Sequence, residues 1–441
     1  MRKIKKDLKK WLVFPLVILF SACTKEVELP LGPERPAEQT PGGLEIILQT
    51  PQPDKVVMSG ALKNTETEPG LTVYHEEQEW TVKQLGVYIF KKNPDGGNTD
   101  ADYTLVKKTE KITFLPESEA GTGENLAENQ GIDKGNGIYS YTEPVEDYMM
   151  NSTLKILLVA NEGEITSATT DAEGATGTKL SDFRKITAKA ELTDQTSADV
   201  ISGGKYDFSE GAENSAYKGI VMSAVATKGD NAVGSPSNEE IKLSNVPQVH
   251  KLKATLVRNV ARIDIRMNKK AMVLKKAVLK NAASKAYLFA QASTTAAPDD
   301  AEYYTMLPTD QFELLGTGYG DGADEGISYK VPETDDETEE VTKDRNTLKH
   351  VFYLYEQVNS EAKSATVEIT YTLPDKDGKL HKGVLEIPLK KTGDTQEYIP
   401  TTRNHLYTIV LGDGSMDGKV NVDLIVEDWI PNDLHEFVPL D

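Results

Sequence analysis

This 441-residue chain has little of the chemistry that most enzymes need. It contains one cysteine and six histidines, so a disulfide within the chain is excluded. No histidine stands in an HExxH motif, and no GxSxG segment offers a serine nucleophile. Acidic residues are plentiful, but they cluster in glycine-rich and threonine-rich stretches typical of solvated loops. The sequence therefore predicts a protein that is not an enzyme, with no cofactor and no metal.

Basic residues are also in deficit, with 49 lysines and arginines against 70 aspartates and glutamates and a net charge of −21. A surface of this sign repels phosphate backbones and anionic lipid headgroups. Nucleic acid is therefore excluded as the main partner. The charge fits a well-solvated, exported surface protein.

The single cysteine has an informative position. Cys23 follows a basic stretch, a ten-residue apolar run interrupted by Pro15, and the small pair Ser21 and Ala22. The run is about half as long as a membrane-spanning helix, and the order of the parts is typical of a secretory signal. Because Cys23 directly follows the small pair, the segment looks like a lipobox, in which the thiol carries lipid and anchors the chain in the outer membrane. An ordinary signal peptide with a chance cysteine is the alternative.

Helical periodicity is scarce, and short candidates lie only at 77–85 and 178–184. Alternation with period two dominates instead, as in 44–49, 365–374 and 419–429, and this pattern is typical of half-buried strands. Continuous apolar runs at 85–90, 154–160 and 350–355 predict central strands. Stretches rich in Asp, Asn and Gly separate the runs, as turns require.

These patterns predict an all-β fold of two tandem antiparallel β-sandwich domains. The predicted organisation is a signal peptide over 1–22, a proline-rich tether over 23–42, an N-terminal domain over 43–245 and a C-terminal domain over 246–441. Acidic stretches at 117–131 and 332–344 are interpreted as surface loops.

One loop could offer oxygen ligands to calcium. Asp95, Asn98, Asp100 and Asp102 are closely spaced, but the loop lacks the closing glutamate of a calcium motif. A plain hairpin loop is the favoured interpretation, and a calcium site stays the alternative.

Five segments together resemble one family, the fimbrillins, which are the FimA-type subunits of type V pili. They fall in a consistent order over roughly the last half of the chain: YKGIVMSAVAT (217–227), TLVRNVARIDI (255–265), VFYLYEQ (351–357), YIPTTRNHLYTIVL (398–411) and VNVDLIVEDW (420–429). In the second segment, Arg258 and Arg262 would lie on the outer face of a buried strand.

The resemblance implies a lipoprotein with two transthyretin-like, Greek-key sandwiches that polymerises by β-augmentation with other pilin subunits, in a homopolymer or a mixed fibre. In shaft subunits, a protease removes the tether and the first strand, and the C-terminal strand of a neighbour fills the groove. On this chain the removable strand would be 44–49, with Leu44, Ile46 and Leu48 in the groove. The donor segment would lie within 431–441, with these apolar candidates: Leu434, Phe437, Val438 and Leu440.

The processing site departs from the family pattern. The best-known protease of this system cuts after arginine, yet no arginine lies between Arg35 and Arg184. Lys55 and Lys63 are the basic residues closest after the first strand and are the candidate cut sites. Either another protease acts there, or the subunit keeps its first strand and its lipid as an anchor or accessory component.

Three functions stay open from the sequence. The leading one is a structural subunit of a cell-surface fimbrium that supports adhesion. The second is a surface lipoprotein, or a tip or anchor component of a pilus, that binds host glycan or protein through its long loops. An extracellular hydrolase, motivated only by the abundance of acids, ranks well below both.

Overall fold

A computed structural model describes most of the chain between residues 42 and 428. The described residues are 42–50, 79–120, 126–170, 177–189, 219–228, 239–246, 248–290, 297–308, 312, 315, 326–331, 339–375, 377–390, 397–413 and 420–428. Several predicted site residues lie outside them: Cys23, Lys55, Lys63, Leu434, Phe437, Val438 and Leu440. No helix in the described ranges is long and apolar enough to span a membrane.

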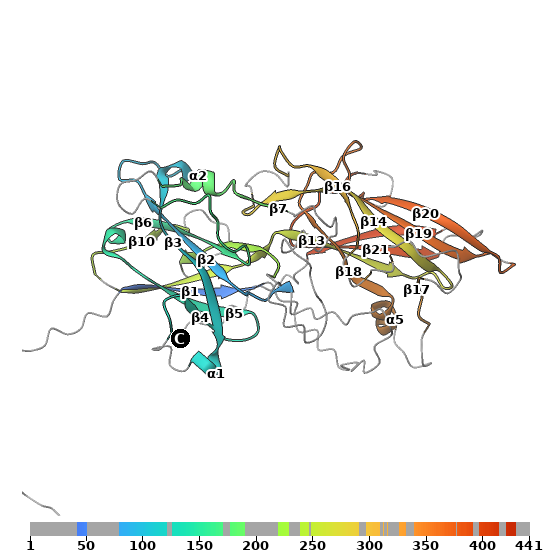
Figure 1. Ribbon diagram of the computed structural model, residues 1–441, viewed down its shortest axis with the longest axis horizontal. Coiled ribbons are helices and arrows are strands. Elements are labelled where there is room, and N and C mark those ends of the chain that lie inside the picture. The colour runs from blue at the N-terminus through green and yellow to red at the C-terminus, as the bar shows by residue number, and fades with distance from the viewer. Residues whose placement is uncertain are drawn as a thin grey trace, which may run out of the picture. The chain divides into compact units, whose positions relative to one another are not determined.

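The first group of strands, here called the N-terminal sandwich, lies in residues 43–258 (Figure 1). Its described strands follow the hydrogen-bonded order β12-β8-β6-β2-β3-β4-β5-β1-β11-β9, with β10 on β6. Their bounds are β1 (Gly43–Gln49), β2 (Leu85–Lys92), β3 (Tyr103–Pro116), β4 (Gln130–Asp133), β5 (Ile138–Pro144), β6 (Thr153–Ala160), β8 (Met222–Val225), β9 (Thr227–Lys228), β10 (Ile241–Lys242), β11 (Val249–Thr255) and β12 (Val257–Arg258).

The long strand β3 takes part in both layers of the N-terminal sandwich. Its first part pairs with β2 as far as Ile112, and its last part pairs with β4 from Thr113 onward. Lys111, in the β2–β3 bulge between Thr109 and Ile112, has a left-handed φ of 60°. Side chains of β1 and β11 from one layer and of β2 and β6 from the other share one buried apolar cluster. The arrangement is therefore a β-sandwich with its core between the layers.

The second group, the C-terminal sandwich, consists of two further sheets (Figure 1). One sheet has the order β18-β13-β21-β22, and the other has the order β16-β14-β19-β20, with β17 on β14. Their bounds are β13 (Val260–Met267), β14 (Val273–Ala283), β16 (Tyr303–Met306), β17 (Ile327–Ser328), β18 (Thr347–Tyr355), β19 (Thr366–Pro374), β20 (Leu380–Pro388), β21 (His405–Asp413) and β22 (Val420–Asp428). Inward side chains of both sheets form one large core.

A small two-stranded sheet links the two sandwiches. In it, β7 (Thr187–Lys189) pairs with β15 (Lys285–Tyr287). Nearby, Phe183 contacts Phe289, with ring centroids 5.7 Å apart. All the described residues fall in one compact unit. Strand β11 follows the predicted boundary at residues 245 and 246 but pairs with β1 of the N-terminal sandwich. The chain passes from the sheet of the N-terminal sandwich to the sheets of the C-terminal sandwich between β12 and β13. The predicted domain limits stay a prediction.

Helices are few and short in the described part of the chain. They are α1 (Glu117–Ala120), α2 (Leu180–Phe183), α5 (Glu339–Arg345) and the 3-10 turns η2 (Asp100–Asp102) and η3 (Asp147–Met149). Both α1 and α5 fall in acidic stretches interpreted above as loops. The all-β class predicted from the sequence is confirmed. Most strand pairs are antiparallel, but β1–β11, β3–β4 and β13–β21 are parallel.

One strand position differs from the prediction. The apolar runs in β2 and β6 are central, as expected, whereas the run at 350–355 lies in β18, which pairs with β13 alone among the described strands. Every residue of the run at 350–355 is nevertheless buried. Its continuous apolar character therefore reflects cover on both faces and not a central place in the sheet.

Candidate functional site

The most distinctive feature of the N-terminal sandwich is the position of its first described strand, β1. Strand β1 lies between β5, with which it is antiparallel, and β11, with which it is parallel. Each of its seven residues has a partner on both sides. Here the space that β1 fills between β5 and β11 is called the β1 slot.

The side chains of β1 alternate as the sequence predicts. Leu44, Ile46 and Leu48 are fully buried in the core of the N-terminal sandwich, while Glu45 and Ile47 are partly exposed on the opposite face. Burying an aliphatic side chain of this size contributes about 1.5–3 kcal/mol. The three inward side chains therefore make β1 an integral part of the core.

Hydrogen bonds also secure both ends of β1. At the start, the Gly43 N–H donates to the carbonyl of Gln248 at 3.2 Å. At the end, Thr50 is fully buried, and its N–H and hydroxyl donate to the carbonyl of Gly137 at 2.9 and 3.2 Å. If β1 left, two strand edges and an apolar strip would be exposed together, which is a binding surface for another strand.

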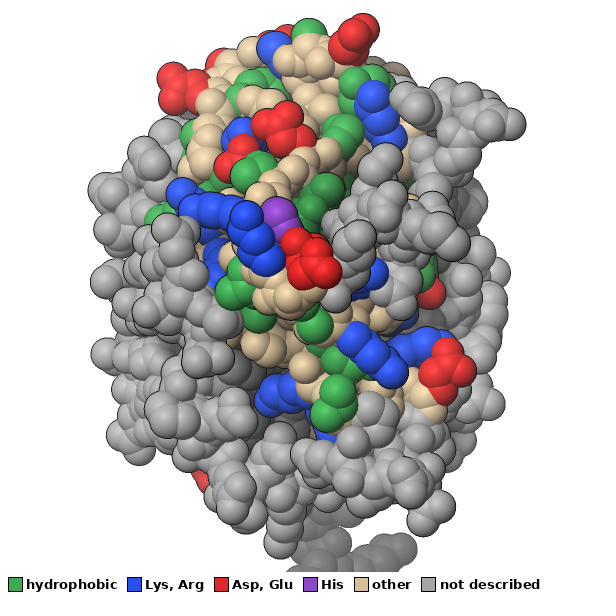
Figure 2. All heavy atoms as spheres, turned by 90° about the vertical axis from the view of Figure 1, so that its right-hand side faces the viewer, with side chains coloured by type: hydrophobic (Ala, Val, Ile, Leu, Met, Phe, Trp, Pro, Cys, Tyr) green, Lys and Arg blue, Asp and Glu red, His purple; other side chains and the backbone are tan. Residues whose placement is uncertain are grey.

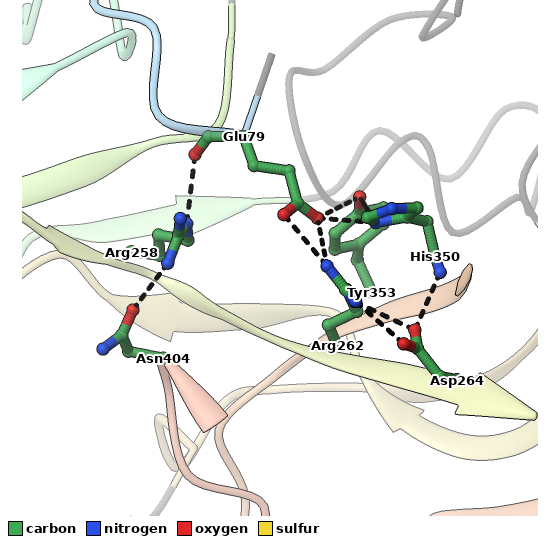
Figure 3. Close-up of polar contacts among 7 residues, drawn as sticks. All are labelled: Glu79, Arg258, Arg262, Asp264, His350, Tyr353 and Asn404. Atoms are coloured by element: carbon green, nitrogen blue, oxygen red, sulfur yellow. Dashed lines mark hydrogen bonds and ion pairs between the residues drawn. The ribbon is translucent and has the colours of Figure 1, made fainter. Parts of the chain in front are cut away.

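The described part of the chain resumes at Glu79. The side chain of Glu79 lies in a buried group of polar residues. This Glu79 cluster brings together side chains from the N-terminal stretch, β12, β13, β18 and the turn before β21 (Figure 3). Its members are Glu79, Arg258, Arg262, Asp264, His350, Tyr353 and Asn404. The carboxylate of Glu79 is 2% exposed and accepts hydrogen bonds from Arg262 at 3.0 Å and Tyr353 at 2.8 Å.

Arg258 binds the backbone of Glu79. Its Nε donates to the Glu79 carbonyl at 3.0 Å, and Nη1 donates to Oδ1 of Asn404 at 3.1 Å. Arg262 lies on the face of β13 opposite Ile263, as the sequence predicts, but this face is covered and Arg262 is only 6% exposed. Arg258 thus bridges Glu79 to Asn404, before β21, and Arg262 bridges Glu79 to β13.

A distortion of β18 completes the cluster. The β13–β18 register shifts between Ile263 and Ile265, and His350 has a left-handed φ of 62°. The His350 N–H donates to Oδ1 of Asp264 at 2.8 Å, and its Nδ1 lies 2.7 Å from Oε1 of Glu79. Asp264 in turn binds the Arg262 guanidinium through Nε at 2.9 Å and Nη2 at 2.8 Å. The bulge therefore brings a histidine against a carboxylate that the flat strand would not reach.

The charges in the cluster are balanced by their neighbours. Burial by itself would raise the pKa of Glu79, but the Arg262 guanidinium and the hydrogen bond with His350 outweigh it and hold the pKa well below its usual range. Burial and the charge of Arg262 lower the pKa of His350. Glu79 is therefore a carboxylate and His350 a neutral ring at physiological pH. The buried contacts of Glu79 with Arg262 and His350 therefore fix the position of the chain at residue 79.

A second buried ion pair connects three of the segments that carry the family resemblance. Arg403 donates from Nε and Nη2 to the carboxylate of Glu356, both at 2.7 Å, and from Nη1 to Oδ1 of Asn259 at 3.1 Å. All three residues are at most 6% exposed. These polar residues therefore have an architectural role in the C-terminal sandwich.

The acidic loop considered for calcium has other partners. The Asp100 carboxylate forms ion pairs with Lys155 at 2.9 Å and Arg184 at 2.7 Å. Asp102 accepts hydrogen bonds from the N–H and hydroxyl of Thr99. Over the ranges that the structure describes, no group of three or more His, Cys, Asp or Glu side chains could hold a metal.

The structure thus brings Leu44, Ile46 and Leu48 together in one slot, while the other predicted site residues lie outside the described residues. Sequence reasoning missed the Glu79 cluster. The only available signal was the pair of arginines, Arg258 and Arg262, in a segment rich in apolar residues. Nothing local pointed to a glutamate 179 and 183 positions before them.

Comparisons with known proteins give structural neighbours only. No protein-family model matches the chain, and no curated protein matches it. Solved structures that resemble it include the tip fimbrial protein Mfa3 from Porphyromonas gingivalis, with a C-terminal truncation. That match has 13% identity, covers 88% of this chain and 100% of that one, and has a TM-score of 0.39.

Two further solved structures are similar. A fimbrial assembly protein from Parabacteroides distasonis has 12% identity, with 88% of this chain and 95% of that one covered and a TM-score of 0.39. The fimbrial anchor protein Mfa2 from Porphyromonas gingivalis has 10% identity, 88% and 98% coverage and a TM-score of 0.34. The chain is thus similar to fimbrial proteins, the group that its sequence segments resemble. At these identities and TM-scores the likeness assigns no function, which is argued below from the chain's own residues.

Proposed function

We propose that this protein is a structural subunit of a cell-surface fimbrium of the type V class, exported as a lipoprotein through Cys23 and joined to its neighbours by strand exchange. The role is mechanical and not enzymatic. The observation that carries the proposal is the β1 slot, in which the first described strand contributes three fully buried side chains and pairs on both sides. Removal of such a strand creates a site that another strand of the same pattern can fill.

The slot sets requirements for the incoming strand. It needs apolar side chains at three alternate positions, in place of Leu44, Ile46 and Leu48, and a free edge on each side for hydrogen bonding. In the tail, Leu434, Val438 and Leu440 share one parity, and Phe437 has the other. The tail therefore meets the requirement in part.

Strand β22 meets the same requirement more fully. Val420, Val422, Leu424 and Val426 alternate without interruption, and their side chains are only partly buried against the core of the C-terminal sandwich. Among the described strands, β22 pairs with β21 alone. Residues 420–428 are thus a second candidate donor beside the tail.

The Glu79 cluster supports the processing step of this proposal. Lys55 and Lys63 precede Glu79, so a cut at either would leave the new chain start upstream of a residue held by Arg258 and Arg262. These buried contacts would keep the start attached to the C-terminal sandwich after β1 departs. If no cut occurs, β1 and the lipid stay, and the protein serves as an anchor or accessory component.

Cysteine crosslinking tests the proposal, because Cys23 is the only native thiol. Ser140 lies on β5, one wall of the β1 slot, and pairs with Ile47 of β1. Cells that express Ser140→Cys together with Phe437→Cys test the tail as donor, and Ser140→Cys with Ile425→Cys tests β22. We expect a disulfide-linked ladder of subunits in sheared filaments from one double variant, and none from Ser140→Cys alone.

Intact mass of the protein from cells separates the anchor and shaft roles. A mass that includes acylated Cys23 indicates an anchor, and a start near residues 56–64 indicates a processed shaft subunit. Absence of the protein from sheared filaments, with no ladder from either double variant, would contradict the fimbrial role.

A second candidate function is a surface component, at the tip or the anchor of a pilus or on its own, that binds host glycan or protein. A cleft at one end of the C-terminal sandwich favours it, because the cleft combines an aromatic ring with charged side chains. Immobilised glycans and host proteins exposed to the purified protein test this function, and binding no higher than background would count against it.

A further inference from the structure

The cleft in question lies between the turn that joins β13 to β14 and the hairpin of β19 and β20. Its volume is about 550 Å³, which is in the range of small-molecule sites. Ala271, in the turn, has a left-handed φ of 62°, a conformation that a residue with a side chain seldom adopts. This β19–β20 cleft is separate from both the β1 slot and the Glu79 cluster.

An aromatic ring and a glycine form part of the cleft wall. Tyr371 on β19 lies directly opposite Gly383 on β20, and a Cβ atom at position 383 would lie 2.3 Å from the Tyr371 ring. Only glycine therefore lets the ring lie across β20. Together with Leu373, the ring gives the cleft an apolar surface of the kind that packs against the C–H face of a sugar ring.

Much of the rest of the cleft lining carries charge. The net charge of these side chains is positive, whereas that of the whole protein is negative. Lys269, Lys270 and Lys382 line the cleft, with one carboxylate, Asp375, and one histidine, His381. Figure 2 looks onto this end of the C-terminal sandwich and shows lysine or arginine side chains gathered beside a histidine and carboxylates. A local excess of cations in a chain of net charge −21 favours a small anionic ligand, because a long polyanion would be repelled by the surrounding surface.

The carboxylate is held in place within the hairpin. Asp375 accepts hydrogen bonds from the backbone N–H groups of Asp377 and Lys379, both at 2.9 Å, and from Nε2 of His381 at 2.7 Å. The hydrogen bond with His381 lowers the pKa of Asp375, which therefore stays ionised. A fixed carboxylate has lone pairs left to accept hydroxyl groups, whereas lysine ammonium groups bind a carboxylate as point charges.

We propose that the β19–β20 cleft binds a sugar that carries a carboxylate, of the uronic or sialic acid type, at the end of a glycan. The Tyr371 ring packs on the sugar face, the lysines bind its carboxylate, and Asp375 accepts its hydroxyls. This proposal deepens the surface role proposed above by naming a ligand class. It does not depend on strand exchange, so sugar binding and filament assembly can fail separately.

Calorimetric titration of the purified full-length protein tests the proposal. The probes are glucuronic acid and N-acetylneuraminic acid, with glucose as the neutral match and acetate as a carboxylate without a sugar. We expect at least one acidic sugar to bind about tenfold more tightly than glucose or acetate, because charge-assisted hydrogen bonds add roughly that factor. Equal affinity for glucose, equal affinity for acetate, or no binding of either acidic sugar would overturn the proposal.

Surface variants locate the binding. Lys270→Glu combined with Lys382→Glu should weaken acidic-sugar binding by about tenfold or more. Lys242→Glu, an exposed lysine on β10 in the N-terminal sandwich, is the matched control and should bind as the unaltered protein does. Thermal melts of each variant report whether the fold is kept. Unchanged binding by the folded double variant would show that the sugar binds elsewhere and would overturn the assignment.

Discussion

The first and the last described strands of this chain are held in different ways. Strand β1 has a hydrogen-bonded neighbour on each side, and its inward side chains Leu44, Ile46 and Leu48 are fully buried. Strand β22 pairs with β21 alone among the described strands, and inward side chains such as Leu424 are only half-buried. Strand β1 is therefore part of the core of the N-terminal sandwich. Strand β22 packs at the edge of the C-terminal core.

This difference shows where each sandwich can change. Exchange of β1 needs a replacement that restores three buried side chains and two rows of hydrogen bonds, so an empty β1 slot would be strongly unstable in water. Detachment of β22 would expose a partly covered apolar strip and one edge. Under the strand exchange proposed above, the comparison favours the N-terminal sandwich as acceptor and the C-terminal part of the chain as donor.

The largest expected effect concerns the link between the two sandwiches. Glu79→Ala removes the carboxylate that Arg262 and Tyr353 contact, and loss of one partner from a buried ion pair costs about 3–5 kcal/mol. We expect this decrease in the free energy of unfolding by urea titration. Glu361→Ala, at an exposed position, is the control and should change stability by less than about 0.5 kcal/mol. Equal, small effects of both changes would show that the cluster does not join the sandwiches energetically.

Leucine truncations compare the two strands directly. Leu44→Ala should lower the free energy of unfolding by about 3 kcal/mol, since it leaves a cavity in a fully packed site. Leu424→Ala should cost about 1 kcal/mol, because its side chain is partly exposed already. Urea titration of the two variants gives both values. If Leu424→Ala costs as much as Leu44→Ala, the contrast between a core strand and a marginal strand is wrong.

Acid should weaken the same link. The pKa of Glu79 is lower in the folded state than its ordinary value of 4.5, so its stabilisation is present above that pH and is lost as pH falls through the folded pKa. The pKa of His350 is lowered from 6.5, so the unfolded chain takes up a proton first and stability decreases below pH 6.5. Both groups therefore make the melting temperature fall with acidification.

A variant separates the histidine part of this dependence. His350→Asn removes the titrating ring, and asparagine tolerates the left-handed φ at this position better than most residues. Between pH 7 and 5 the melting temperature of His350→Asn should fall less than that of the unaltered protein. A residual decrease is expected from His250, whose pKa is lowered by burial and by Lys228. Parallel curves for the two proteins would contradict the role of His350.

The smallest effect is expected on the outside of the C-terminal sandwich. Lys280 on β14 contacts Glu368 at 2.5 Å and Glu386 at 3.0 Å, but the three side chains are 24–64% exposed. Exposed ion pairs contribute little, so Lys280→Ala should change the free energy of unfolding by less than about 1 kcal/mol. A loss as large as that of Glu79→Ala would show that surface charges, and not the buried cluster, dominate the electrostatic stability.

Much of the fold could be predicted from local patterns. Alternation indicated β1, β19 and β22 and the inward face of each, because the side chains of a strand point to opposite faces in turn. Continuous apolar runs indicated β2 and β6. The same signal gave the wrong place for β18, since burial of both faces leaves the same pattern in an edge strand as in a central one.

The sites were less accessible to sequence reasoning. The inward side chains of the β1 slot follow from alternation, but its walls, β5 and β11, are distant in sequence and carry no local mark of their pairing. The Glu79 cluster depends on one carboxylate meeting Arg262 and His350 across long separations and on a bulge that turns His350 inward. Periodicity does not encode such contacts.

The pairing of β1 has one more consequence, for the direction of an incoming strand. Because β1 is parallel to β11 and antiparallel to β5, the two walls of the slot run in opposite directions. A strand inserted with either polarity would meet one parallel and one antiparallel neighbour and form the same kinds of ladder. The order of side chains along the donor therefore decides which way it enters, and replacing its inward apolar residues with charged ones would prevent insertion in both orientations.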